Sequence, residues 1–117
     1  MAVAETDRLT AVLAELRAFN RARDWERFHD PKNLAMAVAS EAGELLALFR
    51  WVDGADADRL ATDPEQRQAV AAEAADVGIT LLLFCDRVGL DLVDAVRAKI
   101  AANHERYPPQ RYRGRWQ

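Results

Sequence analysis

The stretch LAMAVASEAGELLAL, residues 34–48, carries the strongest helical pattern in this chain. At about 100° per residue, its apolar side chains recur on one face of an α-helix. Glu41 falls in the middle of that face, between Val38 and Leu45. Burying an unpaired carboxylate is costly, so this glutamate is expected to have a partner of opposite charge. Few basic residues lie on the inward faces, which makes a metal cation the natural candidate.

Two acidic pairs in the chain share one spacing. Glu41 and Glu44 lie three residues apart, and so do Glu73 and Asp76 in a later segment. Side chains with this spacing project from the same side of a helix. If the two pairs face each other, four carboxylates form an oxygen-only site that suits Mg²⁺ or Mn²⁺. The alternative for Glu44, Glu73 and Asp76 is a solvated helix face.

Start and stop signals divide the chain into four helices. Each of the last three follows an aspartate that can act as N-cap, and two of these aspartates precede a proline. The predicted helices span about residues 7–23, 31–50, 64–88 and 92–107, with a loop at 52–62 and an irregular tail at 109–117. These lengths favour an all-α, antiparallel four-helix bundle in one domain, residues 1–108.

Composition narrows the possible functions. The chain of 117 residues has a net charge of −3 with acids and bases interspersed, which gives no electrostatic case for binding nucleic acid polymers. The single cysteine, Cys85, excludes an internal disulfide and is interpreted as buried. No signal peptide is evident, and the near-apolar run at 77–85 is half a membrane span. We expect a cytoplasmic protein that binds no membrane.

The third and fourth predicted helices carry two further signals. The second half of the third helix is apolar almost all round, which is typical of a central helix or of a subunit interface. On the fourth helix, Lys99 and Asn103 continue an apolar face that begins at Leu92 and Val96. Lys99 would either neutralise the carboxylates as an ion pair or hold a phosphate, and both interpretations stay open. Arg106 and Tyr107 follow at the helix end.

Aromatic residues flank the second predicted helix. Trp25 and Phe28 precede it, and Trp51 lies at its end. Such tryptophans belong either to the core or to a pocket that stacks a nucleobase, which contributes ~1–3 kcal/mol per base. His29 either caps the helix or contacts a ligand. Carboxylates for Mg²⁺, a cation for phosphate and aromatic planes for a base together describe a nucleoside triphosphate pocket.

Several motifs carry a family resemblance. They are RDWERFH (23–29), PKNL (31–34), SEAGEL (40–45), FRW (49–51), EAADV (73–77) and KIAANHERYP (99–108). In these motifs the chain resembles the all-α nucleoside triphosphate pyrophosphohydrolases of the MazG-like superfamily, and within it the dCTP pyrophosphatase branch. The resemblance implies Mg²⁺-dependent hydrolysis of dCTP or a modified dCTP to the monophosphate and pyrophosphate, in nucleotide-pool sanitation.

The resemblance also implies roles for individual residues. Catalytic and metal-binding roles fall on the four acids, and Lys99 is implied as a catalytic, phosphate-binding residue. The implied substrate contacts are Trp25, His29, Asn33, Trp51, Thr80, Lys99, Asn103, Arg106 and Tyr107. Two positions depart from animal members, because Thr80 replaces a tyrosine and Leu16 replaces a histidine. The departures leave the base and sugar preference open.

The resemblance further implies a homo-oligomer, a dimer or a tetramer of bundles with pockets between chains. Two alternatives to the dCTP interpretation remain. One keeps the chemistry and changes the substrate to dUTP or another noncanonical nucleotide. The other is a noncatalytic helical module that binds a partner through its apolar third helix.

Overall fold

The computed structural model describes residues 5–115, with side chains described from Arg8 onward. Its elements are α1 (Glu5–Ala22), η1 (Glu26–Phe28), α2 (Pro31–Ala47), α3 (Gly54–Thr62), α4 (Pro64–Val88), α5 (Leu92–Arg106) and α6 (Pro109–Tyr112). The all-α class is confirmed, and so are the four long helices.

Local hydrogen bonds explain why these helices begin and end where they do. The N-cap carboxylates accept backbone N–H bonds: Asp30 from Asn33 at 2.8 Å, Asp63 from Glu65 at 3.1 Å, and Asp91 from Asp94 at 2.9 Å. Each bond satisfies one of the unpaired donors of a helix start. Gly89 ends α4 with a φ of 73°, a left-handed conformation that glycine adopts without steric cost.

Two expectations of irregular structure are wrong. Residues 54–62 form the helix α3 instead of a loop, stabilised by an ion pair between Asp56 and Arg59. Leu60 and Ala61 lie half-buried on α3, which packs on α4, so tertiary contact adds to local propensity. The tail forms the helical turn α6 at 109–112, where Tyr112 packs edge-on against Tyr107 with ring centroids 5.1 Å apart. Residues 116–117 of the predicted tail lie outside the described residues.

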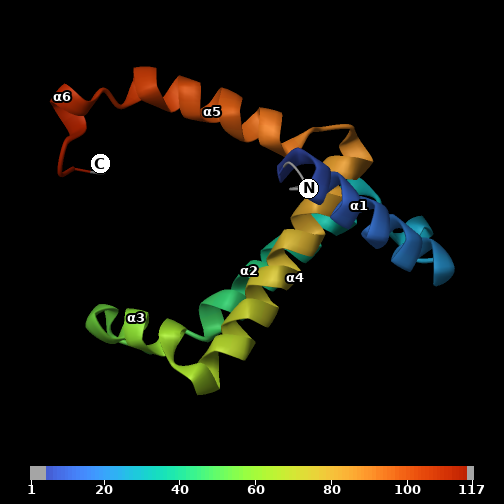
Figure 1. Ribbon diagram of the computed structural model, residues 1–117, viewed down its shortest axis with the longest axis horizontal. Coiled ribbons are helices and arrows are strands. Elements are labelled where there is room, and N and C mark those ends of the chain that lie inside the picture. The colour runs from blue at the N-terminus through green and yellow to red at the C-terminus, as the bar shows by residue number, and fades with distance from the viewer. Residues whose placement is uncertain (1–4, 116–117) are drawn as a thin grey trace.

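The helices form an antiparallel pair with extensions rather than a closed bundle. α2 lies alongside α4, α3 packs near the start of α4, and α1 packs on α4 (Figure 1). α5 projects away from this pair as a separate arm, and α6 bends at its far end (Figure 1). The four-helix bundle expected of one chain is therefore not confirmed.

Two measures show how open the single chain is. The radius of gyration is 17.4 Å, whereas a compact domain of this length would have about 13.4 Å. The exposed surface is 9482 Å², whereas a compact monomer of this mass would expose about 6,400 Å². The chain thus leaves surface uncovered that a folded monomer of this size normally buries.

The best-buried apolar side chains lie at one end of the helix pair. Leu34 on α2 is 3% exposed and Cys85 on α4 is 6% exposed, so the prediction of a buried Cys85 is confirmed. Burial raises the pKa of the Cys85 thiol above its usual value. A neutral thiol behaves as a small apolar side chain, so Cys85 contributes packing.

Leu34→Ala should lower the free energy of unfolding by about 2–3 kcal/mol, because truncating a buried leucine loses apolar burial and leaves a cavity. Urea denaturation followed by circular dichroism measures the loss. Val12→Ala on α1, where the side chain is 43% exposed, should cost clearly less. Equal losses for the two variants would contradict the central position of Leu34.

Candidate metal centre

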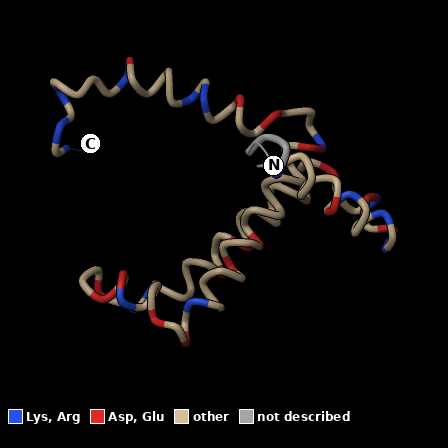
Figure 2. Tube along the Cα trace, in the orientation of Figure 1, with Lys and Arg blue, Asp and Glu red and all other residues tan. Residues whose placement is uncertain are grey.

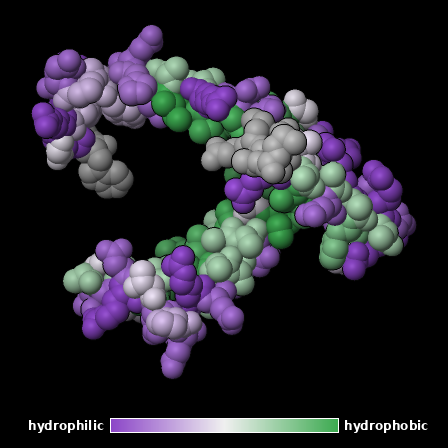
Figure 3. All heavy atoms as spheres, viewed as in Figure 1, coloured by the Kyte–Doolittle hydropathy of each residue, from purple (hydrophilic) through white to green (hydrophobic). Residues whose placement is uncertain are grey.

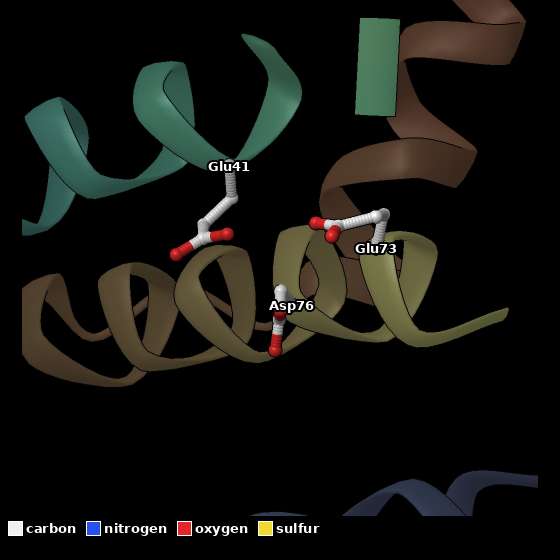
Figure 4. Close-up of side chains that lie close together, drawn as sticks. All are labelled: Glu41, Glu73 and Asp76. Atoms are coloured by element: carbon white, nitrogen blue, oxygen red, sulfur yellow. The ribbon is translucent and has the colours of Figure 1, made fainter. Parts of the chain in front are cut away.

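Three carboxylates converge between α2 and α4. Glu41 comes from α2, while Glu73 and Asp76 come from α4 one turn apart. Each offers one oxygen such that the three oxygens lie within 4.8 Å of one another, and all three side chains are half-buried. Figure 4 shows Glu41 reaching from its helix toward α4, with Glu73 directed into the same space. The antiparallel packing of two helices therefore unites acids from distant parts of the sequence.

The electrostatics of this cluster are unfavourable without a cation. The pKa of Glu41 is raised, first by partial removal from water and then by the charges of Asp76, Glu73 and Glu44. The ion pairs among the described residues all lie elsewhere. Closely spaced oxygens with unbalanced negative charge match the ligands that Mg²⁺ and Mn²⁺ prefer. The residues thus fit a hard divalent cation.

Glu44 takes a different position from the other three acids. It lies one turn beyond Glu41 on α2, remains exposed, and is not among the converging oxygens. The spacing predicted four converging carboxylates, and the structure brings three together. A metal-binding role for Glu44 stays a prediction.

The two tryptophans expected to frame the base lie apart in one chain. Trp25 precedes α2 and Trp51 follows it, so about 24 Å of helix separates the two ends. Trp25 packs edge-on against Phe19 with centroids 5.8 Å apart, whereas Trp51 is 88% exposed. One chain alone cannot place both rings on the same base.

The other expected substrate residues near α2 and α4 have defined surroundings. The Asn33 side-chain amide donates to the Phe28 carbonyl at 3.0 Å, which ties η1 to the start of α2. The Thr80 hydroxyl lies 3.1 Å from the carbonyls of Asp76 and Val77, one turn from the cluster. His29 is half-buried and lines a pocket between α1 and α4.

The expected phosphate-binding residues lie on the projecting arm. Lys99 and Arg106 are exposed on α5, and Tyr107 follows the helix end. Asn103 is half-buried and lines a shallow hollow with Tyr107. Because α5 points away from the α2–α4 pair, this chain does not bring Lys99 to its own carboxylates (Figures 1 and 2).

One feature of the structure escaped the sequence patterns. Arg17 on α1 donates to both carboxylate oxygens of Asp86 on α4, with Nε 3.1 Å from Oδ2. This pairing lowers the pKa of Asp86, chiefly through the hydrogen bond from Arg17, and raises the pKa of Arg17. The sequence does show a charged residue, Asp86, directly after the apolar run at 77–85, and this position indicates that it needs a partner. The sequence does not show that the partner is Arg17, because that depends on how α1 crosses α4.

Asp86→Asn should lower the melting temperature by a few degrees at pH 7, with a smaller effect in acid. The folded-state pKa of Asp86 lies below its ordinary value of 3.8, so the pairing stabilises the fold above that value. The stabilisation is lost as pH falls through the folded-state pKa. Thermal melts from pH 7 to pH 2 measure this, and Arg17→Met in a double-mutant cycle isolates the pair. A pH-independent difference would contradict the assignment.

Comparison with known proteins places the chain in a family. The model of the MazG-like family matches residues 36–114, and the chain therefore belongs to the MazG-like family. It is 42% identical over 96 residues to dCTP pyrophosphatase 1 of Rattus norvegicus, and 40% identical over 90 residues to dCTP pyrophosphatase 1 of Homo sapiens. These matches cover 82% and 77% of this chain but 56% and 53% of the two relatives, so the chain spans about half their length. The resemblance predicted from the motifs is confirmed.

A solved structure supports the fold. The crystal structure of a pyrophosphatase from Archaeoglobus fulgidus matches with a TM-score of 0.81 and 32% sequence identity. The match covers 92% of this chain and 99% of that one. The helical arrangement described above is thus that of a known pyrophosphatase.

Proposed function

We propose that this chain is a nucleoside triphosphate pyrophosphohydrolase that depends on Mg²⁺ or Mn²⁺. The observation that carries the proposal is the convergence of Glu41, Glu73 and Asp76 within 4.8 Å in a chain of the MazG-like family. The products would be a nucleoside monophosphate and pyrophosphate. The favoured substrate is dCTP or a modified dCTP, because the similar mammalian proteins are named dCTP pyrophosphatase 1. We place the reaction in the cytoplasm.

The three converging acids would hold the divalent cation. When bound, this ion supplies positive charge that neutralises the polyphosphate. The chain's own work is then to position the nucleotide and to accept a proton from the attacking water. Glu44 is the acid left for the proton, because it lies one turn from Glu41 and outside the converging set.

Glu44→Gln should therefore reduce kcat by about 100-fold or more while leaving Mn²⁺ affinity nearly unchanged. The amide keeps the shape of the side chain but is no longer a base. Initial rates of pyrophosphate release give kcat, and isothermal titration with Mn²⁺ gives the affinity. A parallel loss of metal affinity would assign Glu44 to the metal instead.

The uncovered surface supports assembly of the chain with copies of itself. Large side chains along α2 and α5 are exposed, including Met36 at 63%, Leu46 at 59% and Ile100 at 50%. Figure 3 shows hydrophobic residues along the visible face of the helix pair and over the middle of α5. Exposed apolar surface of this kind marks an interaction site. The excess over a compact monomer is about 3,000 Å² per chain, at or above the roughly 1,000–2,500 Å² that each partner of a permanent interface buries.

We place a second copy on this surface, in a dimer or a tetramer. The α5 arm of one copy would cover the α2–α4 groove of the other, so that Lys99 and Asn103 approach the acids in trans. The same assembly would bring tryptophans from two chains to one base. The proposal explains why α5 carries both an apolar face and phosphate-binding residue types although its own chain offers it little to pack on.

Helix α4 combines unusual length with an apolar composition. Among the described helices it is long and apolar enough to cross a membrane, judged by length and composition only. The apolar run at 77–85 is shorter because it leaves out the alanines and the valine at 69–75. The core helix of a soluble protein passes the same test, and Glu73 and Asp76 interrupt α4. We therefore propose that a second copy, not lipid, covers α4.

A substrate panel tests the proposed activity. Pyrophosphate release is measured with dCTP, 5-methyl-dCTP, dUTP, dTTP, dATP and dGTP, each with Mg²⁺, Mn²⁺ or EDTA. We expect metal-dependent turnover that is fastest with a cytosine nucleotide, and chromatography should identify the monophosphate as product. Fastest turnover of dUTP would change the substrate and keep the chemistry. No turnover with either metal would favour the noncatalytic helical module.

A further inference from the structure

A pocket separate from the acidic cluster lies between α1, η1 and the C-terminal part of α4. Its volume is about 240 Å³. Leu34 and Leu83 provide its apolar part, and His29 lies at its edge with the buried residue Asn20. Charged residues complete the lining: Arg17, Arg21, Glu26, Asp86 and Arg87.

Most of the charges around the pocket are already paired. Arg17 binds Asp86, and Arg21 lies 3.4 Å from Glu26. Paired charges leave little attraction for a phosphate, which needs unpaired cations. The pocket therefore offers neutral hydrogen-bonding groups inside a frame of ion pairs, a setting that suits a neutral, planar ligand.

Asn20 is the group that points to such a ligand. The residue is only 6% exposed. Its backbone carbonyl accepts the N–H groups of Arg23 and Trp25 at 3.2 and 3.0 Å, which fixes its position at the end of α1. Its side-chain amide makes no hydrogen bond with the described residues. Among those residues, no side-chain polar atom is both fully buried and without a hydrogen-bond partner, so the Asn20 amide must keep some accessible surface. Because Asn20 lines the pocket, we infer that this surface faces the pocket. Buried amides normally have partners, so this one is available to a ligand.

The pocket and the acidic cluster lie along the same pair of helices, α2 and α4. Leu34 lies seven residues before Glu41 on α2, and Leu83 lies seven residues after Asp76 on α4. Seven residues are about two helical turns, so each leucine falls on the same face as its acid, about 10 Å along the axis. Because the helices are antiparallel, both leucines lie toward the same end (Figure 1). A nucleotide with its phosphates at the acids would extend its base toward this pocket.

We propose that Asn20 is a specificity-determining residue that reads the hydrogen-bonding edge of the base in this pocket. The inference rests on the proposed nucleotide hydrolysis. A carboxamide presents an acceptor and a donor side by side, which matches the amino group and ring nitrogen of cytosine and, with the amide turned over, the carbonyl and ring N–H of uracil. The ratio between dCTP and dUTP reports which of the two orientations the pocket holds. Leu34 and Leu83 bound the base, and the Arg17–Asp86 pair holds the wall formed by α1 and α4.

Two substitutions at Asn20 test the proposal. Asn20→Ala should lower kcat/KM for the preferred pyrimidine nucleotide by about 10–100-fold, the value of one good bidentate contact, and flatten the ratio between dCTP and dUTP. Asn20→Asp keeps the shape but replaces the donor with a second acceptor, so it should weaken binding both of cytosine, whose ring nitrogen needs that donor, and of uracil, whose carbonyl needs it. Mn²⁺ affinity and the melting temperature should change little in Asn20→Ala, whereas Asn20→Asp should lower the melting temperature because it places a carboxylate at a position that is only 6% exposed. Glu15→Gln, an exposed change on the same helix, is the matched control.

A second measurement separates this inference from the proposed activity. Deoxycytidine, which has no phosphates, should shift the side-chain amide resonances of Asn20 in NMR spectra recorded without metal. If the wild type hydrolyses nucleotides but Asn20→Ala keeps the wild-type base ratio, the inference is wrong. A uniform loss for all nucleotides with reduced Mn²⁺ affinity would also overturn it. If no nucleotide is hydrolysed, the proposed function fails, and the absence of deoxycytidine shifts would then refute the pocket assignment as well.

Discussion

Glu41→Gln should reduce metal-dependent pyrophosphate release by at least about 100-fold while making the metal-free protein more stable. Both effects follow from the position of one carboxylate. Glu41 lies half-buried, with a carboxylate oxygen within 4.8 Å of those of Glu73 and Asp76. Without a cation, the negative charges of its neighbours repel the charge of Glu41, whereas a bound cation needs that charge as a ligand. Few structural sites show opposite effects on stability and activity, which makes the pair of measurements diagnostic.

The pH dependence of the stability gain has a definite sign. The folded-state pKa of Glu41 is raised above its ordinary value of 4.5, so ionisation of Glu41 destabilises the metal-free fold. The gain from Glu41→Gln should be full above the raised pKa, should shrink as pH falls below it, and should vanish below the ordinary value of 4.5, where the glutamate is protonated in both states. Thermal melts of both proteins in EDTA measure it.

Metal titration completes this experiment. Wild-type protein should gain melting temperature when Mg²⁺ or Mn²⁺ is added, because a ligand that binds only the native state stabilises it. The gain should be lost in Glu41→Gln and kept in Glu15→Gln, where the side chain is exposed on α1. Full activity in a folded Glu41→Gln protein would refute the metal centre.

Lys99→Ala should lower the activity by about 100-fold. Part of the activity should return when the Lys99→Ala chain assembles with a chain that carries Glu41→Gln. The loss is expected because a cation that meets the polyphosphate stabilises the charge that develops during hydrolysis. The restoration is expected because α5 projects from its own α2–α4 pair, so Lys99 would serve the acids of another copy (Figure 1). Coexpression of the two inactive chains, followed by rate measurement, tests both points.

The expected recovery distinguishes the two arrangements quantitatively. If Lys99 acts in trans within a dimer, half of the randomly assembled dimers are mixed and each has one intact site, so about a quarter of the sites recover. If Lys99 acts on its own chain, every site retains one lesion and no activity returns. Arg97→Ala, an exposed cation two residues away on α5, should stay active alone. Recovery no greater than background would refute the exchange of α5 between copies.

Short-range patterns predicted the helices well because their physical causes are local. An aspartate followed by proline determined the first residue of α2 and of α4, and Gly89 determined the end of α4. The missed helix α3 lacks an equally strong start signal, since its N-cap Asp53 makes no side-chain capping bond. Its stability comes partly from packing on α4, which no local pattern reports.

Sequence patterns alone predicted the four acids from which the candidate site is drawn and the family to which the chain belongs. Spacing alone placed Glu41 on an apolar face and set Glu73 beside Asp76, because helical periodicity puts residues three apart on one side. Side-chain convergence depends on the rotation and crossing of whole helices. Three features therefore depend on the packing of whole helices. Glu44 stays outside the cluster, Trp25 and Trp51 lie at opposite ends of α2, and α5 projects away from the α2–α4 pair of its own chain. The pocket around Asn20 likewise required α1, η1 and α4 to be packed together, since residues far apart in sequence meet only through packing.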